Sequence, residues 1–255
     1  MKRILIVAGA CCATSLPVAA TAEAAQSTAR LRSFSCKQAV RPVGRAVAVG
    51  AVMRPVRGTK RLALRFELLT RLKPGGPWTA VSAGDLGSWI SPSDRTLGRR
   101  PGDVWIFNKS VGDLAAPAAY RYRVSFRWFG ARQRVLRTTA LFSSVCSQPE
   151  LRPDLAVQSI VVEPIPGHPD RDHYLATIVN QGATAASSFR VQFVPGGGLP
   201  AEFRNVPRLA PGRTLEVSFD GPACNTTAAS TVTADPDGAV DDANRANNTE
   251  TAACS

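Results

Sequence analysis

Residues 120–129, YRYRVSFRWF, decide the fold of the first half of this 255-residue chain. Large apolar side chains occupy every second position, namely Tyr120, Tyr122, Val124, Phe126 and Trp128. Arginines occupy three of the positions between them, Arg121, Arg123 and Arg127. A strand places alternate residues on opposite faces, whereas a helix would scatter these rings around its circumference. The stretch predicts a β-strand with one aromatic face in a core and one arginine face in solvent.

Neighbouring segments continue this period-two pattern. Residues 47–53 and 62–68 alternate in the same way, and residues 135–142 follow a Phe129-Gly130 turn as a hairpin partner. We expect Trp78 in the core and residues 84–113, rich in Gly, Ser, Asp and Pro, as long surface loops. In the second half, residues 189–193 and 215–219 alternate between turn signals. The expected fold is all-β: two immunoglobulin-like antiparallel β-sandwich domains in tandem.

The chain divides into four parts on this interpretation. Residues 1–24 read as a secretory signal peptide: a basic start, an apolar run and small residues around Glu23. A basic domain then covers 31–147, a polar linker with two prolines covers 148–153, and a second domain covers 154–255. Two alternatives stay open for the start of the chain. It forms a buried strand, or AGAC (8–11) is a lipoprotein box that anchors the chain through Cys11.

The cysteine count supports export. Four cysteines follow the signal segment: Cys36, Cys146, Cys224 and Cys254. An even number in an exported chain indicates disulfides, and four cysteines allow three pairings. Pairing within each domain, Cys36 with Cys146 and Cys224 with Cys254, is the economical choice. No CxxC spacing suits zinc, and we expect no metal or cofactor.

Charge is distributed unevenly over the two halves. Residues 25–150 hold 22 Lys and Arg against 6 Asp and Glu, whereas residues 151–255 hold 7 against 12. A basic exported domain attracts anionic envelope polymers, and Arg121, Arg123 and Arg127 are the candidate contacts. The alternative is that the arginines are only a solvated face of an arginine-rich composition. We expect no nucleic-acid binding, because no aromatic-basic stacking motif is visible.

A short motif links the first half to a known family. Leu114, Pro117, Tyr120 and Val124 stand at the spacing L-x-x-P-x-x-Y-x-x-x-V. The spacing resembles the entry to the sixth strand of fibronectin type III domains, where the tyrosine makes a corner hydrogen bond. The resemblance covers roughly residues 33–146 and implies a fibronectin/immunoglobulin-like sandwich.

The second half carries several motifs in order. They are PDL (153–155), ATIVNQG (176–182), LAPG (209–212) and TADPDGAVDDANRANN (233–248). Together they resemble the CARDB family, a cell-adhesion-related domain of bacterial surface and secreted proteins, over residues 153–254. The resemblance implies an immunoglobulin-like adhesion or spacer module without catalysis. Asp242 and Arg245 stand where the family commonly has glutamates.

Two polar clusters are candidates for metal binding. His168, Asp170, Asp172 and His173 lie in one expected hairpin loop, but Arg171 sits among them. The acidic loop 235–248 is attractive to calcium, yet it fails the EF-hand pattern, and aspartates also build turns. No GxSxG elbow is present, the cysteines are expected to be oxidised, and histidine is nearly absent as an acid–base group, so we expect no enzyme.

The resulting expectation is a non-enzymatic protein, extracellular or associated with the cell envelope, with adhesion or interaction modules. Its partner is a cell-envelope polymer or another surface protein, and we expect no transmembrane segment after signal removal. The alternative is an accessory module of a secreted hydrolytic system that docks on carbohydrate or protein. For that role, the candidate exposed aromatics are Trp89 and Trp105.

Overall fold

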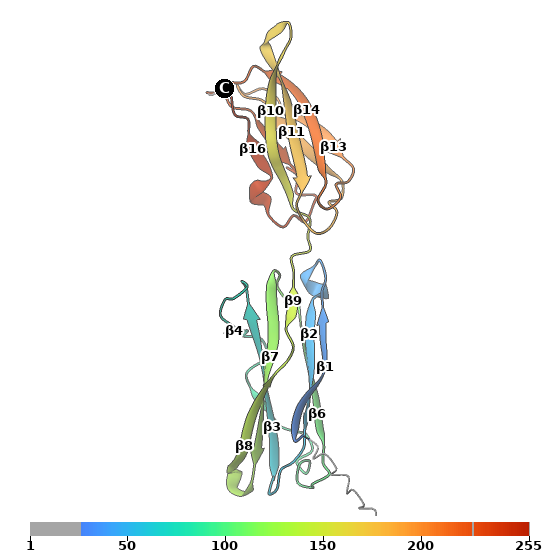
Figure 1. Cartoon of the computed structure of the whole chain (residues 1–255), viewed down its shortest axis with the longest axis vertical. Coiled ribbons are helices and arrows are strands. Elements are labelled where there is room, and N and C mark those ends of the chain that lie inside the picture. The colour runs from blue at the N-terminus through green and yellow to red at the C-terminus, as the bar shows by residue number, and fades with distance from the viewer. Residues whose placement is uncertain (1–26, 226, 255) are drawn as a thin grey trace, which may run out of the picture.

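The structure is a computed structural model that describes residues 27–225 and 227–254. The expected signal peptide and the AGAC box lie outside the described residues. Figure 1 shows two sandwiches placed end to end and joined by a single connecting segment between β9 and β10. The expected all-β fold of two immunoglobulin-like sandwiches is confirmed.

The N-terminal domain consists of two antiparallel sheets. The smaller sheet has the order β1-β2-β6, and the larger has the order β4-β3-β7-β8, with β5 paired to β3 and β9 paired to β7. Their bounds are β1 Ala29–Lys37, β2 Ala46–Met53, β3 Arg61–Arg71, β4 Thr79–Ala80, β5 Trp89–Ile90, β6 Trp105–Gly112, β7 Ala118–Phe129, β8 Val135–Phe142 and β9 Cys146–Gln148.

Strand β7 has the orientation that its sequence predicts. Tyr122, Val124, Phe126 and Trp128 are fully buried, and Tyr120 is nearly so. They lie beside the inward side chains of β3 in the same sheet and pack against β2 of the other sheet, and together these apolar residues form one core. Arg121, Arg123 and Arg127 point the other way. Burying five such side chains is a strong driving force for pairing this strand at the centre of the sheet.

The expectation of surface loops over 84–113 is wrong for its last third. Strand β6 pairs with β2 at eight consecutive positions, from Trp105 opposite Met53 to Gly112 opposite Ala46. Trp105 is buried, and Phe107 and Val111 pack on the core. This strand is hard to recognise in the sequence because it contains polar Asn108 and Lys109 and follows turn residues. Pairing with the apolar strand β2 holds it in the sheet.

The tyrosine corner implied by the fibronectin-like motif is present. The Tyr120 hydroxyl donates to the carbonyl of Ala115 at 3.0 Å, and Leu114 beside it is buried. The hydrogen bond ties the connection between the two sheets to the start of β7.

We expect Tyr120→Phe to lower the free energy of unfolding of this domain by about 1 kcal/mol, because one buried hydrogen bond is lost while packing is kept. Urea unfolding followed by tryptophan fluorescence measures this change, since all four tryptophans lie in this domain. Tyr122→Phe is the control, because that hydroxyl makes only a 3.4 Å contact with Val47 O. Equal effects of the two substitutions would contradict a corner role.

The C-terminal domain repeats the two-sheet plan. One sheet has the order β10-β11-β14 and the other β13-β12-β15-β16. Their bounds are β10 Leu155–Ile165, β11 His168–Asn180, β12 Phe189–Val194, β13 Glu202–Val206, β14 Thr214–Pro222, β15 Thr231–Ala234 and β16 Thr249–Thr251. The alternating residues 189–193 form β12, and those of 215–219 lie in β14, with Phe193 and Phe219 stacked in the core.

Asn180, at the end of β11, joins three separate segments of this domain. Its side chain is fully buried and makes four hydrogen bonds. The Oδ1 atom accepts from the backbone N–H groups of Asp154 and Gly182, and Nδ2 donates to the carbonyls of Thr184 and Leu209. All four hydrogen-bonding positions of the amide are used.

Both disulfides form as the economical pairing predicts. Cys36–Cys146 links β1 in the small sheet to β9 in the large sheet, so it joins the two layers of the first sandwich. Cys224–Cys254 links the end of β14 to the end of the described chain.

A charged cluster occupies the connection between β9 and β10. Glu150 accepts two hydrogen bonds from the Arg152 guanidinium, and it lies 3.8 Å from the buried Arg45 of the first domain. Arg152 in turn contacts Asp241 of the second domain at 3.4 Å. Partial burial raises the pKa of Glu150, but the hydrogen bonds from Arg152 outweigh it, and the net pKa is lowered. The connection is thus held by polar contacts on both sides.

Candidate functional site

The outward face of the large N-terminal sheet gathers six arginines. We call this surface the arginine face and define it by Arg61, Arg65 and Arg71 of β3 with Arg121, Arg123 and Arg127 of β7. The two strands pair in register from Arg61 opposite Phe129 to Arg71 opposite Ala119. Period-two alternation on both strands places these side chains on the same side of the sheet, away from the core.

Aromatic rings lie under five of these guanidiniums: Arg61 lies over Phe129 at 4.1 Å, and the other four lie over tryptophans. Arg65 and Arg127 both lie over Trp89, with distances of 5.2 and 4.1 Å from the guanidinium carbon to the ring centroid. Arg71 and Arg121 both lie over Trp78, at 4.8 and 4.3 Å. Each tryptophan therefore carries one arginine from β3 and one from β7, at distances typical of cation–π contacts.

A single carboxylate accompanies these cations. Glu67 lies 3.2 Å from Arg65 and 3.9 Å from Arg123. Within residues 27–225 and 227–254, Arg71, Arg121 and Arg127 form no ion pair. The face has six positive charges against one negative charge, so the field above it favours an anion.

Stacking leaves the terminal amino groups of these arginines as the polar edge of the face. The Nε atoms of Arg65, Arg121 and Arg127 are buried and have no hydrogen-bond partner in the described structure. Ring contact holds the guanidiniums of Arg121 and Arg127, and Glu67 also contacts that of Arg65. A guanidinium donates two parallel hydrogen bonds to phosphate or carboxylate oxygens, and a fixed plane reduces the entropy that binding costs. The arrangement is suited to binding oxyanions.

The three arginines predicted from the sequence have different surroundings. Arg121 lies between Trp78 and Phe142, and Arg127 lies over Trp89. Arg123 is the most exposed of the three and faces Glu67 across the strand pair.

Two expectations about tryptophans are wrong. Trp78 is half-buried against arginines on the outer face, and Trp128 is the fully buried core tryptophan instead. Trp105, expected as an exposed aromatic, is 7% exposed in the core. Trp89 alone of that pair reaches the surface, and its ring is in contact with two guanidiniums.

Sequence reasoning did not select Arg65 or Arg71 as contacts, it placed Trp78 in the core, and it named Trp89 only as an aromatic for carbohydrate docking. The alternation of residues 61–71 places these arginines on an outward face. Their approach to β7 depends on the cross-strand register, however, which one sequence does not reveal. Aromatic-basic stacking is present here between strands rather than within one motif.

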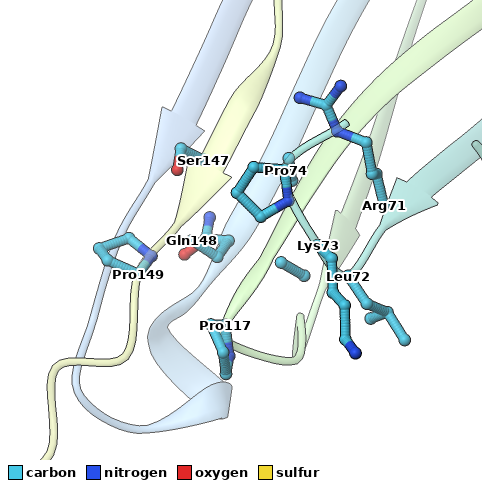
Figure 2. Close-up of a pocket in the computed structure, with 10 residues that line it drawn as sticks. Arg71, Leu72, Lys73, Pro74, Pro117, Ser147, Gln148 and Pro149 are labelled. Carbon is cyan, nitrogen blue, oxygen red and sulfur yellow. The ribbon is translucent and has the colours of Figure 1, made fainter. Parts of the chain in front are cut away.

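A shallow groove of about 220 Å³ lies at the end of the arginine face, close to the second domain. Figure 2 shows Arg71 at the end of β3, with Lys73 and Pro74 of the following hairpin, on one side, and Ser147 and Gln148 of β9 on the other. Its volume is below the range of small-molecule pockets. The groove therefore extends the basic surface and does not form a separate ligand cavity.

The comparison with family models decides the identity of the second half. The CARDB model matches residues 152–252. The C-terminal domain belongs to the CARDB family. The match spans all seven strands of this domain, from β10 to β16.

One of the solved structures to which this chain is similar also shares sequence with part of it. It is a domain from Methanosarcina acetivorans, described as belonging to a cell surface protein, with 31% identity over 40% of this chain and 90% of that chain, at a TM-score of 0.35. Red sea bream transglutaminase matches 88% of this chain over 31% of its own length, at 14% identity and a TM-score of 0.30. No curated protein matches the chain.

In the CARDB domain, the histidine–aspartate cluster does not converge on one point. The expected loop is instead the start of β11, where alternate residues point to opposite faces. His173 Nδ1 lies 2.8 Å from Asp220 Oδ1, and this contact holds the pKa of Asp220 below its usual value. Asp172 accepts from the backbone N–H of Cys224. No group of three potential ligands in the described chain is arranged to hold a metal ion.

Two carboxylates of the acidic CARDB loop, Asp235 and Asp242, accept hydrogen bonds from backbone N–H groups. Asp235 is buried and accepts from the backbone N–H groups of Ala239 and Val240. Asp242 accepts from the N–H of Leu155 at 3.0 Å and from that of Asn244 at 2.8 Å. Asp242 therefore closes the loop onto the first strand of the domain, which gives this departure from the family pattern a structural role.

Among the described residues, no helix is long and apolar enough to cross a bilayer.

Proposed function

We propose that this chain is a non-enzymatic, exported protein of the cell surface whose N-terminal domain contacts an anionic polymer of the cell envelope. In this proposal, residues 1–24 are a signal peptide, and residues 148–153 separate a basic contact domain from a CARDB adhesion or spacer domain. One observation carries the proposal: six arginines against one carboxylate on a single sheet face, four of them stacked on tryptophans.

Charge supports a division of labour between the domains. Residues 25–150 have a large excess of basic residues, whereas residues 151–255 have an excess of acidic ones. The basic domain attracts polyanions over a distance of about 10 Å at moderate ionic strength. The acidic CARDB domain is repelled by the same polymers. It therefore does not compete for the ligand and acts as a spacer beside the basic domain.

We expect the triple variant R121Q/R123Q/R127Q to lose at least about tenfold in affinity for isolated cell envelopes at low salt, because three cations leave one surface. Pull-down of the mature chain across a salt series measures this loss. The control is R30Q/R57Q/R134Q, which removes the same charge from exposed positions off the face. If both variants lose affinity equally, total charge is responsible and the arginine face is not the contact surface.

A carbohydrate- or protein-docking role in a hydrolytic system is the alternative. Sugar platforms need exposed aromatic rings, and Trp89 and Trp78 have guanidiniums over theirs. Binding to envelopes that is unaffected by salt would favour this alternative.

A further inference from the structure

The arginine face contains the same three-residue unit twice. In the first unit, Trp89 of β5 pairs directly with Arg65 of β3, and Arg127 of β7 lies on the far side of β3. In the second unit, Trp78 immediately precedes Thr79, whose partner is Thr70, so the register places Trp78 beside Arg71. Arg121 of β7 completes this second unit.

The cross-strand offset is identical in the two units. Arg65 is opposite Ser125, and Arg127 is two residues further along β7. Arg71 is opposite Ala119, and Arg121 is again two residues further along. The units are thus six residues apart on both strands, which corresponds to about 20 Å along the sheet.

Each unit concentrates two positive charges on one ring. The two guanidinium carbons in a unit lie within 5.2 Å of the same centroid. In the second unit, neither arginine has a carboxylate partner among the described residues. Two like charges that share one ring repel each other, and an oxyanion that contacts both guanidiniums would relieve the repulsion and accept hydrogen bonds from both.

We propose that the two units are a pair of oxyanion subsites for one linear, phosphate-bearing polymer that runs along β3 and β7. A tetrahedral phosphate group accepts hydrogen bonds from guanidiniums that approach from different directions, whereas a planar carboxylate is satisfied by one parallel pair. Arg123, exposed between the units, contacts the polymer between its two anchored groups. The proposal rests on the proposed function and specifies its ligand.

Two subsites on one rigid sheet make binding depend on chain length. A polymer that reaches both units gains from effective concentration, because its second contact is intramolecular. Triphosphate is too short to bridge them and occupies one unit at a time. The affinity ratio between long-chain polyphosphate and triphosphate therefore reports on bridging.

The test measures this ratio by calorimetry at fixed ionic strength for the full mature chain and for three double variants. R65Q/R127Q removes the first unit, R71Q/R121Q removes the second, and R30Q/R134Q is the charge-matched control off the face. We expect each single-unit variant to lose at least about tenfold in the ratio, and the control to keep it. A long chain offers many phosphate groups to a single unit, and a variant that retains one unit keeps this advantage. The decrease in the affinity ratio therefore measures the loss of bridging between the two units.

Two results would overturn the inference. If both single-unit variants keep the wild-type ratio, the units do not act together. If polyglutamate of matching length binds as tightly as polyphosphate, the face does not select phosphate. Either result leaves salt-sensitive binding to envelopes intact. Failure of the proposed function is different, because R121Q/R123Q/R127Q would then bind envelopes as tightly as its control R30Q/R57Q/R134Q.

Discussion

Removal of the Cys36–Cys146 disulfide is expected to lower the free energy of unfolding of the N-terminal domain by about 5 kcal/mol. The bond joins residues 110 positions apart, and a cross-link of that span strongly restricts the unfolded chain. It also connects the two sheets at a position where Cys146 is fully buried. Losses of this size are comparable to the whole stability of an ordinary domain.

The measurement is urea unfolding of C36A/C146A followed by tryptophan fluorescence, which reports on this domain alone because the CARDB domain contains no tryptophan. The matched control is C224A/C254A. That disulfide spans 30 positions in the other domain, so the fluorescence transition stays where it is in the wild type. An unchanged midpoint in C36A/C146A would show that the first sandwich is stable without its inter-sheet bond.

Asn180→Ala is expected to lower the free energy of unfolding of the CARDB domain by about 4 kcal/mol. The substitution leaves two backbone N–H groups and two carbonyls without their side-chain partner in a buried environment. It also removes the side-chain link between Asp154 and the turn at Gly182, and leaves only the backbone hydrogen bonds from Gln181 to Asp154 and from Ala183 to Arg152. A β-carbon on Gly182 would lie 2.4 Å from the Arg152 carbonyl, so the backbone here has no room to rearrange.

Far-UV circular dichroism during thermal unfolding detects this loss as a separate early transition, while the tryptophan signal of the first domain is unchanged. The control is Asn205→Ala on the exposed strand β13, for which we expect less than about 0.5 kcal/mol. If the CARDB domain unfolds at the same temperature in both asparagine variants, the hydrogen-bond network of Asn180 contributes little to its stability.

The same network explains why the CARDB motifs were readable in sequence. Three of them meet at Asn180: it lies in ATIVNQG itself, and it bonds Asp154 of PDL and Leu209 of LAPG. The fourth, acidic motif reaches Leu155 through Asp242. Residues whose side chains hold backbone groups have few substitutes, so these separated segments predict one domain when they occur in order.

The N-terminal domain was predictable only in part. Strict alternation in residues 120–129 predicted β7 and the outward direction of its arginines, because period-two patterning is a property of the strand itself. Strand β6 was missed, because polar residues interrupt it and its place depends on pairing with β2. The units around Trp78 and Trp89 were missed for the same reason, since they form across three strands that meet only in the folded sheet.

The positions of the disulfides determine how each domain would respond to a pulling force. Cys36 lies in the first strand of the N-terminal domain and Cys146 in its last. A pulling force applied at the two ends of this domain therefore passes through the sulfur–sulfur bond, and the residues between the cysteines cannot be drawn out. In the CARDB domain, only the segment before Cys224 is free to extend. The first sandwich would thus keep its arginine face folded under tension, while the second would extend.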